Sequence, residues 1–110
     1  MPRSRPRSEG GQKGNLGAVR SSLSIYYEDT EGRYPDRLEE LLVGGKYMGT
    51  IPQVQLAPHP KTRAVTYHAT RSPLDTGGFG YVNNPYDPDY GTLWLDCTHT
   101  DPRGAAWASY

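Results

Sequence analysis

The sequence predicts an α+β fold in which one long N-terminal helix packs on a small three- to four-stranded antiparallel sheet. Two patterns predict it. From Gln12 to Asp29 the chain has no proline and its apolar side chains recur at helical spacing, whereas from Arg63 onward apolar and polar side chains alternate in short runs. The first pattern is one stripe of an α-helix, and the second is typical of half-buried strands. At 110 residues the chain is long enough for one domain with a modest core.

The predicted long helix spans residues 12–29. Its core-facing stripe consists of Leu16, Val19, Leu23 and Tyr26. Gly32 is the expected C-terminal cap, and Pro35 follows as a stop signal. Gly14 and Gly17 each cost about 1 kcal/mol relative to alanine in a helix interior. Either the helix begins near Gly17, or small residues here allow another backbone to approach closely.

A short helix and three strands complete the expected fold. Asp36 follows a proline and is placed to cap a two-turn helix over residues 38–42, which a Gly-Gly pair ends. Alternation and bordering turn residues place the strands at residues 63–70, 79–82 and 92–98. The aromatic C-terminal tail either adds an edge strand or docks its side chains on the sheet.

The charges give little indication of a polyanionic partner. Lysine and arginine together number 12, as do aspartate and glutamate, so the net charge attracts neither nucleic acid nor an acidic membrane. Arg3, Arg5 and Arg7 form a basic head that continues into no basic or aromatic face, so nucleic-acid binding is not expected. No apolar run approaches the ~20 residues needed to span a membrane. We expect residues 1–11 to be a flexible leader or a partner-docking segment, and residues 12–110 to form the globular domain.

The order of these elements, together with two short motifs, resembles a known family. Residues 13–27 and the Gly-Arg-Tyr-Pro run at residues 32–35 resemble the second half of the N-terminal helix of type IV pilins and type II secretion pseudopilins, with the Gly-x-Tyr-Pro element that follows it. The short helix at residues 38–42 and the Gly-Gly-Phe-Gly-Tyr start of a strand at residues 77–81 also match. The resemblance covers residues 13–110 and implies a pilin-like fold and a structural role in a filament, with no enzymatic activity.

The end of the chain resembles the split pilins of desulfuromonad type. Those chains finish in a similar Asp-Cys-Thr-His-Thr-Asp run, here residues 96–101, and a terminal aromatic residue, here Tyr110. Family members begin with an apolar helical segment behind a prepilin-peptidase site, and the present sequence shows neither. The resemblance therefore implies the globular half of a split pilin, which docks on a separate short apolar pilin helix and on copies of itself. The alternative is the soluble ectodomain of a type II secretion major pseudopilin.

Both assignments imply a place on the periplasmic side of the inner membrane and then in a filament or at the cell surface, with membrane contact only through the partner. A partner helix presents unsatisfied carbonyls and about half a negative charge at its C-terminal end. We expect Arg3, Arg5 and Arg7 to contact that end, and Gly14 and Gly17 to let the partner approach closely.

Cys97 and His99 suggest catalysis, as a nucleophile and its base with a neighbouring aspartate as orienter. However, Cys97 shares its predicted strand face with Leu93 and Leu95, so we expect it to pack inward as a small apolar side chain. The sequence supplies no recognisable oxyanion site. No catalytic residue is therefore assigned.

Three histidines, His59, His68 and His99, are of a type that ligates metals. None of them pairs at helical spacing, and the single cysteine rules out a two-cysteine site. We therefore expect them to be surface or hydrogen-bonded histidines, and we expect no cofactor.

Calcium has candidate ligands in Asn84, Asp87 and Asp89, which lie on one turn-rich loop. The resemblance adds to this, because type II secretion major pseudopilins bind calcium in a sheet-side loop. The spacing lacks the glycine and the terminal glutamate of an EF-hand. A calcium-dependent binding module built on this loop is the third hypothesis.

Overall fold

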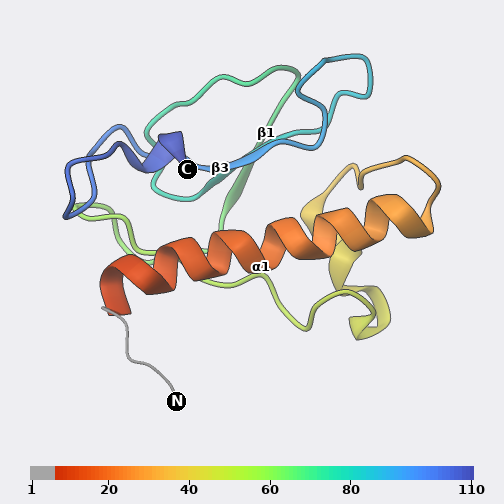
Figure 1. Cartoon of the computed structure of the whole chain (residues 1–110), viewed down its shortest axis with the longest axis horizontal. Coiled ribbons are helices and arrows are strands. Elements are labelled where there is room, and N and C mark those ends of the chain that lie inside the picture. Colours follow the sequence, from red (N-terminus) through yellow and green to blue (C-terminus); the bar gives the residue numbers. More distant parts are fainter. Residues whose placement is uncertain (1–6) are drawn as a thin grey trace.

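The computed structural model describes residues 7–110, with side chains from residue 11 onward. Helix α1 (Arg7–Asp29) lies along the longest axis of the molecule and crosses a small three-stranded sheet (Figure 1). The other elements are, in chain order, the 3₁₀ helix η1 (Leu38–Gly45), the strands β1 (Val65–His68), β2 (Phe79–Val82) and β3 (Leu93–Leu95), and the 3₁₀ helix η2 (Trp107–Ser109). The α+β class that the sequence predicts is confirmed.

Helix α1 begins earlier than the predicted Gln12 and ends at the predicted place. A Schellman motif closes its C-terminal end, where the N–H of Gly32 donates to the Tyr27 carbonyl at 2.9 Å and the N–H of Glu31 donates to the Glu28 carbonyl at 3.3 Å. Glu31 takes the left-handed position, with φ of 60°, and Gly32 follows with φ of 102°. Gly32 is therefore part of the cap, but the left-handed position of the Schellman motif is occupied by Glu31 and not by a glycine.

The N-terminal end of η1 is not capped as the sequence predicts. Arg37, not Asp36, occupies the N-cap position, and it makes no side-chain cap hydrogen bond. The N–H of Leu38 instead donates to the Tyr67 hydroxyl of β1 at 3.0 Å. A hydroxyl from a distant strand thus replaces the local cap, and it ties η1 to the edge of the sheet while Leu38 and Leu41 are fully buried.

The sheet is mixed, so the predicted antiparallel arrangement is wrong for one of the two strand pairs. β2 and β3 are antiparallel, with Phe79 opposite Leu95. β1 and β2 are parallel, with Val65 opposite Phe79. The parallel pair arises because residues 69–78, called here the return segment, bring the chain back to the starting end of β1 instead of reversing it in a hairpin.

A buried carboxylate holds the return segment in place. Asp96 accepts hydrogen bonds from the N–H of Leu74 at 2.6 Å and from the N–H and hydroxyl of Thr76 at 3.3 and 2.8 Å. The Trp94 indole lies on the same face of β3 and packs over Gly80, where an added Cβ would lie 2.3 Å from the ring. Because this face is covered as well as the face toward α1, β2 and β3 are buried along their whole length.

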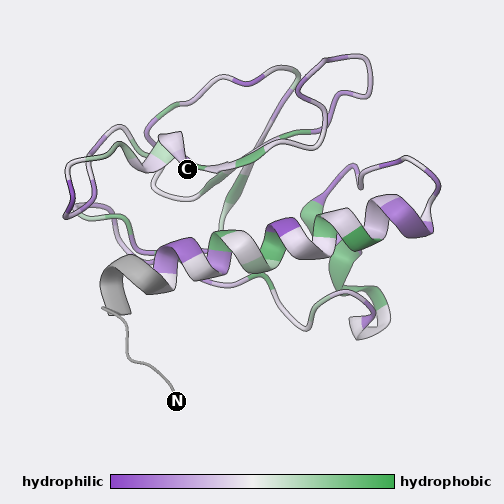
Figure 2. Ribbon diagram, in the orientation of Figure 1, coloured by the Kyte–Doolittle hydropathy of each residue, from purple (hydrophilic) through white to green (hydrophobic). Residues whose placement is uncertain are grey.

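The core lies between α1 and the sheet. Leu16, Val19 and Leu23 are at most 3% exposed, and Tyr26 is half-buried at the edge of the same cluster. In the coloured part of α1, hydrophilic and hydrophobic residues are interspersed (Figure 2). No helix in the described part of the chain is long and apolar enough to cross a membrane. Trp107 of η2 is buried in the same core, so the tail docks an aromatic side chain and adds no strand to the sheet.

Candidate functional site

Two features of the described residues are candidates for a function beyond the fold itself. The first is the open face of α1, defined here as Gly14, Gly17, Ala18 and Ser21, which are all exposed. The second is a group of metal-ligating side chains near the end of β3.

Gly14 and Gly17 lie inside α1 rather than at its start. A Cβ added to either residue would have no heavy atom within 4 Å, apart from its own helix and chain neighbours. The fold of the single chain therefore does not require glycine at these positions. Among the side chains that the structure describes, none covers these two positions. That another backbone approaches here stays a prediction.

The basic head cannot be placed in the same way. Arg3 and Arg5 lie outside the described residues, and Arg7 is the first residue of α1 but its side chain is outside the described part. Arg20, farther along α1, has a role within the fold. Its guanidinium donates to the carbonyls of Leu93 and Tyr110 at 2.7 and 2.6 Å, so it links α1 to β3 and to the tail.

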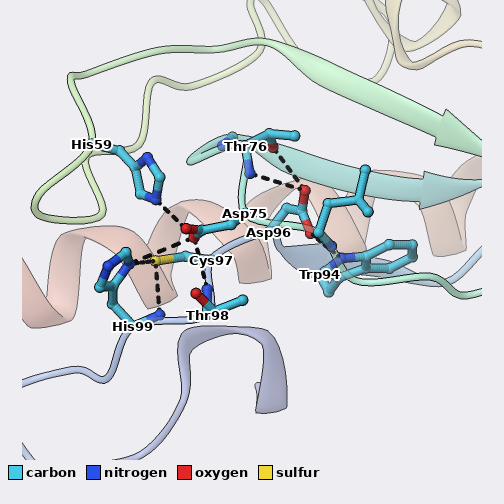
Figure 3. Close-up of polar contacts among 10 residues, drawn as sticks. His59, Asp75, Thr76, Trp94, Asp96, Cys97, Thr98 and His99 are labelled. Carbon is cyan, nitrogen blue, oxygen red and sulfur yellow. Dashed lines mark hydrogen bonds and ion pairs between the residues drawn. The ribbon is translucent and has the colours of Figure 1, made fainter.

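The second feature is the Asp75 cluster, defined as His59, Asp75, Cys97 and His99 (Figure 3). Asp75 Oδ1 lies 2.9 Å from His59 Nε2 and 3.5 Å from His99 Nδ1. Cys97 Sγ lies 3.3 Å from the same His99 nitrogen. One ligand atom from each of the four residues lies within 4.8 Å of the others, and no second group of this kind occurs among residues 11–110.

Backbone contacts fix the members of the Asp75 cluster, which come from three separate segments. Asp75 Oδ1 accepts a hydrogen bond from the N–H of Thr98 at 2.9 Å, and Cys97 Sγ accepts one from the N–H of His99 at 3.3 Å. Gly77, with φ of 84°, lets His59 approach, because an added Cβ would lie 2.5 Å from the His59 side chain. The return segment, held by Asp96, carries Asp75 into this position.

The electrostatics of the cluster oppose a nucleophilic cysteine. The N–H of Thr98 and then the His59 ring lower the pKa of the Asp75 carboxyl to about 2. Burial raises the pKa of the Cys97 thiol, and the nearby Asp75 carboxylate adds to this effect. A reactive cysteine needs a lowered pKa, so the contact between Cys97 and His99 does not form an activated thiol.

The sequence analysis names three of these four residues as candidates, but it does not predict that they lie together. Asp75 was missed altogether, because it lies in a loop that no motif marks and reaches the cluster only through the parallel crossover. The remaining histidine, His68, lies apart from the cluster. Its ring packs on Trp94 with centroids 5.4 Å apart, and its buried Nε2 has no hydrogen-bond partner in the described part of the chain.

The calcium candidates use oxygen atoms to shape their own loop. Asn84 Oδ1 accepts the N–H of Tyr86 at 3.1 Å, and Asp87 Oδ1 accepts the N–H of Asp89 at 2.8 Å. These are Asx turns, in which the side chain stabilises the local backbone. Asn84 also donates to the Ala69 carbonyl at 3.2 Å, so the loop is tied to the end of β1.

The chain was compared with protein-family models, with curated proteins and with solved structures, and none of these comparisons gave a match. No family is therefore assigned to it. The function has to be inferred from the two features above and from the motifs of the sequence.

Proposed function

We propose that the chain is the globular half of a type IV pilin-like filament subunit, with a structural rather than catalytic role. The observation that carries this proposal is the division of α1 into two faces. One face buries Leu16, Val19 and Leu23 against the sheet. The other face presents Gly14 and Gly17, and no atom of another described segment lies within 4 Å of the positions that their Cβ atoms would take.

The energetics of α1 support an outside contact on the open face. Glycine in a helix interior costs about 1 kcal/mol relative to alanine, and alanine fits at both positions without a clash. Two such glycines lower the stability of the isolated domain without a gain in its own packing. Helix pairs approach more closely where the contact residues are small, so the loss is offset when a second helix packs here.

The proposed partner is an apolar pilin helix, whose C-terminal end meets the N-terminal end of α1, and the assembled subunits then pack with copies of themselves. Arg3, Arg5 and Arg7 come just before or at the start of α1, where they would face the carbonyls of the partner helix. The proposed location is the periplasmic side of the inner membrane before assembly, and the filament or cell surface afterwards.

The test is purification of the untagged protein from its native cells, with mass spectrometry of what stays bound. A stoichiometric short apolar polypeptide that starts just after a prepilin-peptidase site is the expected result. One longer chain, with the apolar segment covalently in front of residue 12, would support the alternative, the ectodomain of a type II secretion major pseudopilin. A chain that purifies from the cytoplasm with neither would overturn the filament role.

A further inference from the structure

We propose that the Asp75 cluster is a zinc site, in which His59 Nε2, His99 Nδ1, Cys97 Sγ and Asp75 Oδ1 coordinate one Zn²⁺ ion. The cluster combines two imidazoles, one thiol and one carboxylate, and one ligand atom from each lies within 4.8 Å of the others. This inference does not depend on the proposed filament role, because it concerns a different part of the surface.

Two of the three distances within the cluster match tetrahedral coordination, and the third is shorter. Zinc–ligand bonds of about 2.0–2.3 Å place the ligand atoms of a tetrahedral site roughly 3.3–3.6 Å from one another. His99 Nδ1 lies 3.3 Å from Cys97 Sγ and 3.5 Å from Asp75 Oδ1, and His59 Nε2 lies 2.9 Å from the same oxygen. Since all four atoms lie within 4.8 Å of one another, only small side-chain shifts are needed to centre an ion among them.

The types of ligand indicate the metal. Imidazole and thiolate favour zinc and other later transition metals over calcium and magnesium, which take oxygen ligands. Two histidines and one cysteine also bind copper in electron-transfer sites, but there the fourth ligand is weak and distant. Here the Asp75 carboxylate lies close to both imidazoles, which is the arrangement of four similar ligands that zinc prefers.

The surroundings of the ligands match those of a metal site. Metal ligands are usually held by further hydrogen bonds that orient them. The N–H of Thr98 donates to Asp75 and the N–H of His99 donates to Cys97 Sγ, so two ligand atoms are fixed by the backbone after β3. The Asp75 and His99 side chains are 40% and 43% exposed, which gives an ion access from solvent, while Cys97 closes the site from the core side.

The charges balance when the ion binds. The Cys97 thiol loses its proton to solvent as the Sγ–Zn bond forms, and the two histidines coordinate as neutral rings. One thiolate and one carboxylate then neutralise the two positive charges of the ion. The site would link three segments that contain little regular structure: the loop around His59, the return segment and the chain after β3.

The experiment is a titration of the full, untagged, chelator-treated protein with Zn²⁺ against a chromophoric competitor, together with the absorption spectrum of the Co²⁺-loaded protein. We expect one ion per chain, tetrahedral d–d bands and a thiolate-to-cobalt charge-transfer band. The variants Cys97→Ser and His59→Asn should each weaken Zn²⁺ binding at least about tenfold, and Cys97→Ser should abolish the charge-transfer band. The matched control is His68→Asn, which removes a histidine outside the cluster and should change the affinity less than about twofold.

Several results would overturn the proposal. Unchanged affinity in Cys97→Ser and His59→Asn would mean that the protein binds an adventitious ion only. A cobalt spectrum of the unmodified protein that lacks the charge-transfer band would exclude the cysteine as a ligand, and this measurement holds even if a variant fails to fold. Circular dichroism of each variant separates loss of binding from loss of structure.

Discussion

The Tyr90 hydroxyl binds both backbone groups of Tyr34, accepting its N–H at 2.9 Å and donating to its carbonyl at 2.8 Å. The two rings meet edge to face, with centroids 5.2 Å apart. Beneath them Gly91 allows the Tyr34 ring to approach, since an added Cβ would lie 2.3 Å from it. The Tyr-Pro element after α1 is therefore held by the loop between β2 and β3, and the buried Tyr81 hydroxyl adds a bond to the Pro35 carbonyl at 2.6 Å.

Replacement of Tyr90 by phenylalanine should release this element. The variant Tyr90→Phe keeps the ring but leaves the Tyr34 N–H and carbonyl without their partner, so we expect the free energy of unfolding to fall by about 1–3 kcal/mol. Urea denaturation followed by circular dichroism measures it. Tyr86→Phe is the matched control, because Tyr86 is 93% exposed, and its stability should not change. A loss in Tyr90→Phe no larger than that of the control would contradict the assigned role.

Alanine at the α1 glycines should raise the stability of the isolated chain, whereas leucine there should weaken partner binding. Gly14→Ala and Gly17→Ala meet no neighbouring atom, so each should raise the free energy of unfolding of the isolated chain by about 0.5–1 kcal/mol. Bulkier variants, Gly14→Leu and Gly17→Leu, should reduce binding of the proposed apolar helix without unfolding the chain. Glu28→Leu, at the other end of α1, is the control for added bulk.

Gly80 offers the contrasting case. Its Cβ position is occupied by the Trp94 indole at 2.3 Å, so Gly80→Ala should destabilise the chain by about 1–3 kcal/mol through overpacking. Thermal unfolding of Gly14→Ala and Gly80→Ala side by side checks both signs at once. If both substitutions lower stability, the open face of α1 is not free.

The sequence predicts those elements whose signals lie in residues close together along the chain. The stripe of Leu16, Val19 and Leu23 follows from helical periodicity, and the strand at Phe79–Val82 follows from the Gly-Gly turn before it, because both signals depend only on residues close in the sequence. The direction of β1 relative to β2 was not predictable in this way. It depends on the buried Asp96 carboxylate holding the return segment, a contact across residues that no local pattern joins.

The same reason explains what was missed at the Asp75 cluster. His59, Asp75 and Cys97 lie far apart in the sequence and at no recognisable metal-site spacing, so only the tertiary fold brings them together. The cap of η1 is similar, since Tyr67 supplies it from another element. Asp36 is the local candidate for the N-cap, but the Tyr67 hydroxyl accepts the hydrogen bond from the Leu38 N–H instead.

Acid should weaken the attachment of the C-terminal tail. Asp101 accepts a hydrogen bond from the Tyr110 hydroxyl and others from the N–H groups of Ala105 and Arg103, and Lys13 Nζ lies 3.5 Å away. The Tyr110 bond above all, and then the two N–H groups and Lys13, lower the pKa of Asp101 to about 2.

A carboxyl whose pKa is lower in the folded than in the unfolded chain stabilises the fold above its unfolded pKa. The contribution of Asp101 should therefore be complete above about pH 5, and it should be lost as the pH falls from about 4 to about 2. The free energy of unfolding, measured by urea titration at several pH values, should fall less steeply over this range in Asp101→Asn than in the unmodified chain. Parallel curves would mean that Asp101 is not coupled to folding.

Asp96 should control both the return segment and the Asp75 cluster that it carries. Asp96→Ala removes the acceptor for Leu74 and Thr76 and for the Trp94 indole N–H, which donates at 3.1 Å. Hydrogen bonds to a charged group contribute about 1.5–3 kcal/mol each, so we expect the free energy of unfolding to fall by at least about 2 kcal/mol.

In Asp96→Ala, protection from hydrogen exchange should fall first at residues 69–78. Their backbone would lose its hydrogen bonds to Asp96, while β2 and β3 keep their pairing. Under conditions where the variant is still folded, Zn²⁺ affinity should also fall, since Asp75 is positioned by this segment. Thr76→Val is the milder comparison, because it removes the hydroxyl bond and leaves the two N–H bonds to Asp96. Protection of the return segment in Asp96→Ala equal to that in the unmodified chain would show that other contacts hold it.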